Sequence, residues 1–179
     1  MNTADFVREL ASAAPSKSQL SQAGFSELEI ESTLHEFECI KRSTPITLEA
    51  HDDLFLELIR DWDLSQVKIG SLSFFDEPVV GNENIELGKV ELDILVFNLG
   101  SKEFQLLDHE DRNRVFSAVA QDGEKLMRGL ILLADYFAKT ATDEFDMDDE
   151  ELGDRKVQEC AALLGGKKYE GFSSTMIGF

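Results

Sequence analysis

The chain has 179 residues and a mass of 20.1 kDa, a length that suits one domain, and 42% of its residues are hydrophobic. This apolar content is enough to bury a core, which excludes wholesale disorder. The 36 acidic residues outnumber the 17 basic ones and give a formal net charge of −19 and a pI near 4.4. Such a charge repels nucleic acids and anionic membrane surfaces, so it argues against both as partners and favours a basic one.

The sequence also indicates the cellular compartment in which the protein is expected. The longest apolar runs, such as 94–97 and 130–134, fall well below the roughly 20 residues that cross a bilayer. The first 20 residues lack the apolar stretch of a secretory signal. Cys39 and Cys160 form no CxxC pair and are expected to be buried free thiols in a reducing compartment. We therefore expect a cytoplasmic protein.

Residues 1–45 are predicted to form a helical N-terminal segment. Apolar side chains recur at helical spacing within 4–13. Ser26 followed three residues later by Glu29 is a capping box, and it predicts a helix over about 27–41.

The central part, 46–139, is predicted to mix helices and strands. It begins with a helix that Asp52 or Asp53 caps and whose apolar face extends to Trp62. It ends with a long helix over 122–139 that carries a wide apolar stripe. Between these helices the hydrophobic period changes from helical spacing to two, which predicts strands.

Three strands are predicted in this region. Residues 67–74 suit a strand that is covered on both faces, with a bulge near Gly70 and an end at 76–78. The clearest alternation runs over 89–98, and a short turn links it to an extended segment over 103–107. These last two strands predict an antiparallel hairpin.

The C-terminal part, 140–179, is predicted to be an acidic linker followed by a helical tail. The run 143–154 holds eight acids, and it is either a polyanionic arm or a solvated linker whose last acids cap the next helix. Gly165-Gly166 ends that helix. The tail is too apolar for free coil and is expected to pack through Tyr169, Phe172, Met176, Ile177 and Phe179. We predict one α+β domain over 1–179, with an antiparallel or mixed central sheet flanked by helices and an added helical N-terminal segment.

A group of acidic residues surrounds the predicted strands, with Lys89 as the one nearby base. Carboxylates on strands and their turns hold fixed positions, which a docking surface requires. The alternative interpretation is a solvated sheet edge. As partner-binding candidates we take Asp76, Glu77, Glu83, Glu86, Glu91 and Asp93.

Four consecutive polar residues, 108–111, follow the predicted hairpin and raise the question of a metal site. Adjacent side chains on an extended backbone point to opposite faces, so the four cannot easily converge on one ion. No second histidine stands at helical spacing. The favoured interpretation is a solvated turn, and we assign no catalytic residue, metal or cofactor.

Three pieces of the chain, in order, resemble the SUKH superfamily of bacterial immunity proteins. The resemblance covers about 50–139, although the Leu-Pro step often seen before the first strand is missing. The pieces are Val67-Lys68-Ile69-Gly70 running on to Asp76-Glu77-Pro78; Ile94-Leu95-Val96-Phe97-Asn98-Leu99-Gly100 with Phe104-Gln105-Leu106-Leu107 and Asp108-His109-Glu110; and the helix 122–139 preceded by Val115-Phe116-Ser117-Ala118-Val119.

The resemblance implies an α+β fold and a protein that binds and neutralises a cognate bacterial toxin, commonly a nuclease or deaminase. It supplies no catalytic residues. We therefore expect a non-enzymatic acidic protein with a basic toxin as its partner. The rival hypotheses are a metal-assisted hydrolase that uses Asp108, His109 and Asp111, and a regulatory or structural adaptor with the same fold. A sheet edge and an apolar tail leave homodimerisation open.

Overall fold

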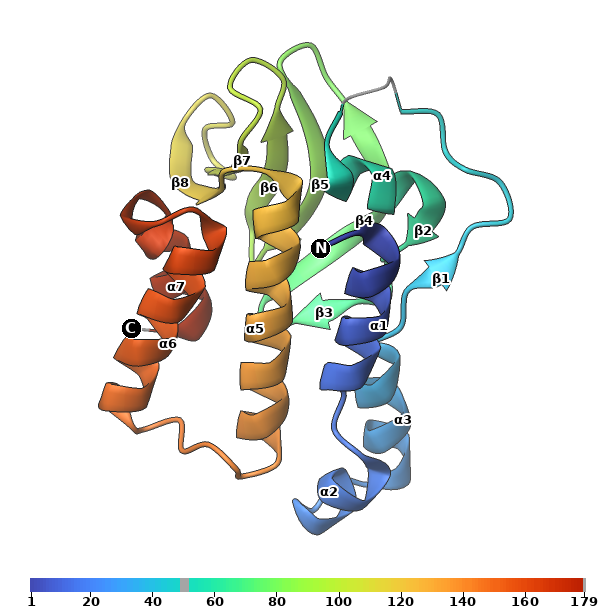
Figure 1. Ribbon diagram of the computed structural model, residues 1–179, viewed down its shortest axis with the longest axis vertical. Coiled ribbons are helices and arrows are strands. Elements are labelled where there is room, and N and C mark those ends of the chain that lie inside the picture. The colour runs from blue at the N-terminus through green and yellow to red at the C-terminus, as the bar shows by residue number, and fades with distance from the viewer. Residues whose placement is uncertain (49–51, 179) are drawn as a thin grey trace.

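The computed structural model describes residues 1–48 and 52–178 and has an α+β architecture (Figure 1). A curled antiparallel sheet has the strand order β3-β4-β5-β6-β7-β8, and β1 pairs with β2 in a second sheet. The strands are β1 (Ile40–Lys41), β2 (Trp62–Asp63), β3 (Lys68–Ile69), β4 (Leu72–Val80), β5 (Asn84–Val90), β6 (Asp93–Asn98), β7 (Phe104–Leu107) and β8 (Val115–Ala120). The predicted fold class is thus confirmed, and within the described residues every paired strand is antiparallel.

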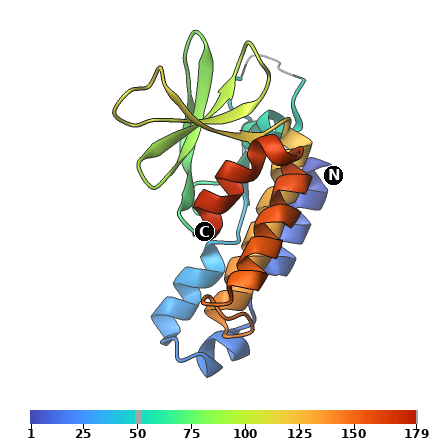
Figure 2. The same cartoon turned by 90° about the vertical axis from the view of Figure 1, so that its left-hand side faces the viewer.

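The helices form a layer beside the sheet. The long α5 lies between α1 and α6 in Figure 1, and Figure 2 shows the strands fanning out at one end of these helices. The helices are α1 (Thr3–Ala13), α2 (Lys17–Gln22), α3 (Glu27–His35), α4 (Leu54–Asp61), α5 (Gly123–Ala141), α6 (Glu150–Leu164), the 3₁₀ turn η1 (Lys167–Tyr169) and α7 (Glu170–Ile177). No helix among the described residues has both the length and the apolar character that a membrane crossing needs.

The predicted capping signals are present, but one helix is shorter than expected. Ser26 and Glu29 form the capping box of α3, and Asp53 caps α4. The helix predicted over 27–41 ends at His35, because the carbonyl of Glu36 turns away to accept the N–H of Lys68 at 3.1 Å. Trp62 belongs to β2 rather than to the preceding helix.

The first predicted strand, 67–74, is instead a tight hairpin. Gly70 adopts φ +56 between β3 and β4, a conformation that glycine tolerates without strain. A Cβ there would also meet the ring of Phe137 at 2.6 Å. The predicted end at 76–78 is wrong as well, since β4 continues to Val80 across a register shift between Phe74 and Val79. Pro78 falls within this irregular stretch, where its missing N–H removes no ladder hydrogen bond.

The strand predicted over 89–98 is wrong, because the chain reverses direction within it. Val90 pairs with Asp93, so Glu91 and Leu92 form a two-residue turn between β5 and β6. Glu91 has φ +54, and Leu92 is 64% exposed. The hairpin of β6 and β7 that was predicted next is confirmed.

One cluster of buried residues extends from Phe6 in α1 to Ile177 in α7. At its centre the ring of Phe104 lies 5.6 Å from Phe55 and 5.1 Å from Phe97. A second, small cluster consists of Ile94, Val96 and Leu107. Because residues alternate along a strand, this cluster lies on the opposite face, so β6 is buried on both faces.

The C-terminal part has the predicted helix and packed tail, but α6 begins at Glu150, within the acidic run that was predicted to precede it. The tail packs through Tyr169, Phe172, Met176 and Ile177, all of them buried, whereas Phe179 lies outside the described residues. The acidic run 143–154 is not a free arm: residues 143–149 form the linker, in which the Phe145 ring lies 6.1 Å from Tyr136, and residues 150–154 belong to α6, which Asp149 caps. Gly165, with φ +128, ends α6.

Candidate functional site

The six candidate acids lie on or between strands β4, β5 and β6, but they do not form a single patch. Glu83 lies in the β4–β5 turn, beside the β6–β7 turn, and its carbonyl accepts the N–H of Leu99 at 2.8 Å. Glu91 and Asp93 lie at the opposite end of the sheet, at the β5–β6 turn. Asp76 and Glu77 occupy the irregular stretch of β4, and Glu86 lies on β5.

Three of these six carboxylates are paired with bases of the same chain. Asp76 lies 3.5 Å from the guanidinium of Arg42, which also donates to the Asp76 carbonyl. Glu86 pairs with Arg112 at 2.7 Å. Asp93 pairs with His109 at 3.0 Å. These acids are therefore partly neutralised, and Arg112 and His109 both come from the loop between β7 and β8.

The other three carboxylates are exposed. Within residues 1–48 and 52–178, the side chains of Glu77, Glu83 and Glu91 have no hydrogen bond or ion pair. Glu83 and Glu91 lie in short turns between paired strands and Glu77 lies in the irregular stretch of β4, so the paired residues on either side hold the backbone of each in place. We call Glu77, Glu83 and Glu91 the unpaired acids.

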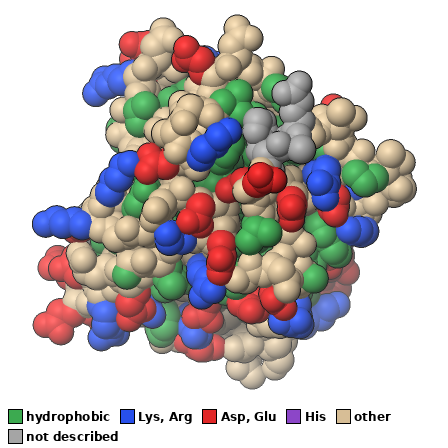
Figure 3. All heavy atoms as spheres, turned by 45° about the horizontal axis from the view of Figure 1, so that its top comes forward, with side chains coloured by type: hydrophobic (Ala, Val, Ile, Leu, Met, Phe, Trp, Pro, Cys, Tyr) green, Lys and Arg blue, Asp and Glu red, His purple; other side chains and the backbone are tan. Residues whose placement is uncertain are grey.

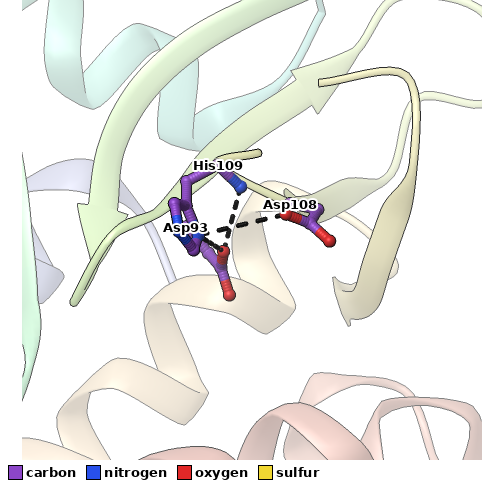
Figure 4. A group of neighbouring side chains, drawn as sticks. All are labelled: Asp93, Asp108 and His109. Carbon is purple, nitrogen blue, oxygen red and sulfur yellow. Dashed lines mark hydrogen bonds and ion pairs between the residues drawn. The ribbon is translucent and has the colours of Figure 1, made fainter. Parts of the chain in front are cut away.

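Asp93, Asp108 and His109 form a compact cluster at one end of the sheet (Figure 4), with one ligand atom from each residue lying within 4.8 Å of the others. His109 Nδ1 is 3.0 Å from Asp93 Oδ1 and 3.9 Å from Asp108 Oδ1. The pairing of Ile94 with Leu107 explains this meeting, because it places the residues just outside the pair, Asp93 and Asp108, next to each other.

The cluster corrects part of the sequence interpretation. Asp108 and His109 do converge, contrary to the expectation for neighbouring residues, because the chain turns after β7 instead of remaining extended. Asp111 is not a member: its carboxylate accepts the N–H of Asn113 at 3.1 Å. The hydrogen bond with Asp93 raises the pKa of His109, and the backbone N–H of Glu110 lowers the pKa of Asp108.

A separate cavity of about 480 Å³ opens at the other end of the β6–β7 hairpin. Figure 3 looks onto this end of the molecule, where acidic side chains gather. Asp53 lines the cavity and is 9% exposed; its carboxylate accepts the N–H groups of Phe55, Leu56 and Gly123. Burial raises its pKa. The cavity is lined by Asp52, Asp53, Phe97, Ser101, Lys102, Glu103, Gln121 and Asp122.

Sequence reasoning offered Asp52 or Asp53 as the cap of α4, which is Asp53, but did not anticipate the cavity. Its wall includes Glu103, whose carboxylate is held by Lys168 at 2.6 Å and by the hydroxyl of Tyr169 at 2.8 Å. These partners come from the C-terminal tail, which the sequence predicted to pack without indicating where. His51 lies outside the described residues.

Comparisons with known proteins identify no relative of this chain. No protein-family model, no curated protein and no solved structure matches it. The resemblance to the SUKH superfamily therefore stays a prediction.

Proposed function

We propose that this protein is a non-enzymatic acidic binding protein that neutralises a basic bacterial toxin of the nuclease class, as the SUKH resemblance implies. The observation that carries the proposal is the set of unpaired acids, Glu77, Glu83 and Glu91, which are exposed on the strands and turns of one sheet.

The chemistry of the partner follows from charge complementarity. A nuclease holds lysine and arginine side chains near its substrate phosphates, and a carboxylate-bearing surface competes with the phosphates for those cations. The formal net charge of −19 adds a long-range attraction that accelerates encounter with a basic protein. The unpaired acids can form ion pairs with a partner without breaking an existing contact. Asp76, Glu86 and Asp93 would first have to give up the base of this chain with which each is paired.

The arrangement of the polar groups favours binding over hydrolysis. The Asp93–Asp108–His109 cluster and the cavity lined by Asp53 lie at opposite ends of the β6–β7 hairpin. A metal-assisted hydrolase needs its cation beside the substrate pocket, so the two features do not support one reaction site.

Co-expression with the product of the adjacent gene tests the proposal. We expect the chain to rescue growth from that product and to purify with it as a stable complex. Reversal of the unpaired acids in the triple variant E77K/E83K/E91K should slow association by about tenfold or more, because attraction between opposite charges governs the rate of encounter.

A second triple variant, E31K/D148K/D154K, is the matched control. These three residues are exposed and unpaired among the described residues but lie on α3, in the linker before α6 and on α6. The control changes the net charge by the same amount away from the sheet, so it should retain most of the association rate. Equal slowing of association by the two variants would show that Glu77, Glu83 and Glu91 do not form the binding surface. Failure of the chain to bind the product of the adjacent gene would contradict the proposed toxin partner.

A further inference from the structure

We propose that Asp93, Asp108 and His109 bind a single Zn²⁺ ion. The cluster combines two carboxylates with one imidazole, and one ligand atom of each residue lies within 4.8 Å of the others. This inference is independent of the proposed function, since it concerns the chain alone and requires no protein partner.

The spacing of the donor atoms suits a tetrahedral ion. Zinc lies about 2.0–2.2 Å from nitrogen and oxygen ligands, so two ligand atoms of one tetrahedral site are roughly 3.3 Å apart. His109 Nδ1 is 3.0 Å from Asp93 Oδ1 and 3.9 Å from Asp108 Oδ1. The two distances fall on either side of the required value, so small side-chain rotations bring these atoms into position.

The backbone supports two of the three ligands. Asp108 Oδ1 accepts the N–H of Glu110 at 2.8 Å, and Asp93 Oδ1 accepts the N–H of His109 at 3.1 Å. Asp108 Oδ1 keeps a further lone pair for a cation, and Asp93 Oδ1, which also contacts His109 Nδ1 at 3.0 Å, gains one when that nitrogen binds the metal in place of a proton. Asp93 is the first residue of β6 and Asp108 directly follows β7, so the pairing of Ile94 with Leu107 beside them sets the separation of the two aspartates.

The charge and the exposure of the cluster suit one divalent cation that keeps one coordination position open. Two carboxylates balance the charge of Zn²⁺, and the side chain of His109 remains 42% exposed, which leaves room for a water or an external ligand. Arg114 contacts the cluster at Asp108 Oδ2, 3.4 Å away, and not at the oxygen nearest to His109. The mixed nitrogen and oxygen donors favour zinc over Mg²⁺ or Ca²⁺, which prefer oxygen ligands alone.

Calorimetric titration of the metal-stripped protein with ZnCl₂ tests the site. We expect one ion per chain, with affinity lowered at least tenfold in H109A and in D93N, and little response to MgCl₂ or CaCl₂. The H35A variant is the matched control, because His35 Nδ1 also pairs with a carboxylate, Glu38 at 2.9 Å, but belongs to no three-residue cluster among the described residues.

Hydrogen exchange supplies a second measurement. Zn²⁺ should slow exchange of the amides in 108–114 in the native chain and not in H109A, while thermal unfolding without metal confirms that both variants are folded. The proposal is overturned by the absence of stoichiometric binding, by equal loss of affinity in H35A and H109A, or by binding that leaves exchange in 108–114 unchanged.

Discussion

Asp53 and Gly123 are 70 residues apart in the chain, yet Asp53 Oδ2 accepts the N–H of Gly123 at 2.8 Å. Asp53 Oδ1 accepts the N–H groups of Phe55 and Leu56. One carboxylate thus joins the first turns of α4 and α5. Gly123 is required for this approach, because a Cβ there would lie 2.3 Å from Asp53 Oδ1.

We expect the substitution D53N to lower the free energy of unfolding by about 1–3 kcal/mol, because an amide nitrogen replaces one acceptor and leaves a buried N–H unsatisfied. The measurement is urea denaturation. The control is D149N at the exposed N-cap of α6, where asparagine accepts the same single bond from the N–H of Leu152 and should cost little. Equal losses in both variants would show that Asp53 does no more than cap α4.

The sequence predicted the capping role of Asp53 but not its second partner. Capping depends on nearby residues, whereas the bond to Gly123 depends on how α4 and α5 pack. The Asp93–His109 pair was missed for a related reason. It depends on the exact register of the β6–β7 hairpin, in which Ile94 pairs with Leu107, and the sequence predicted that hairpin without fixing its register.

The turn at Glu91 was missed because its residues carry no turn signal. Leu92 continues the apolar alternation of Val90 and Ile94, and neither Glu91 nor Leu92 is glycine, asparagine or proline. In the folded chain Glu91 has φ +54, so the tertiary pairing of β5 with β6 overrides the local preference.

The turn gives a second prediction. We expect E91G to raise the free energy of unfolding by about 0.5–1 kcal/mol, because a left-handed conformation costs a residue with a Cβ more than it costs glycine. Thermal or urea unfolding measures the change. The control is K89G, at an exposed site inside β5, which should lower the free energy of unfolding. Stabilisation by both substitutions would contradict the assignment of backbone strain to residue 91.

A third prediction concerns the contact between α5 and α6. A Cβ at Gly129 would lie 2.4 Å from the buried side chain of Leu164. We therefore expect G129A to lower the free energy of unfolding by about 1–3 kcal/mol, although alanine favours helix. At Gly171 in α7 the nearest atom would be Ser117 Oγ at 3.4 Å, so G171A should be neutral or stabilising in the same urea assay. Stabilisation by G129A would contradict the close packing of the two helices.

The two cysteines give a pH-dependent prediction. Burial raises the pKa of Cys39 to about 12 and that of Cys160 to about 11. At pH 8 both thiols are far below their raised pKa values, so both should react slowly with a disulfide reagent such as DTNB and rapidly in 6 M guanidinium. Cys160 is buried, whereas Cys39 is half-buried and not fully buried as the sequence predicted, so rapid labelling of Cys160 in the native protein would contradict its burial.

The raised thiol pKa values also determine how the free energy of unfolding changes with pH. In the unfolded chain a cysteine thiol loses its proton above its ordinary pKa of 9.0, whereas in the folded chain the thiol keeps its proton to a higher pH. The thiol contribution to the free energy of unfolding is therefore complete below pH 9 and declines as the pH rises toward 11. Alkaline unfolding of C160A should show a shallower decline than that of the native chain, and an equal slope would contradict the shift.

The central claim is that exposed carboxylates on the sheet attract a basic protein. Its most direct test is the salt dependence of the association rate between the chain and the co-purified product of the adjacent gene, measured by stopped flow. We expect the rate to fall steeply between about 0.05 and 0.5 M NaCl, where the screening length shortens, and to fall less steeply for E77K/E83K/E91K. A rate that is the same at both salt concentrations would contradict the claim.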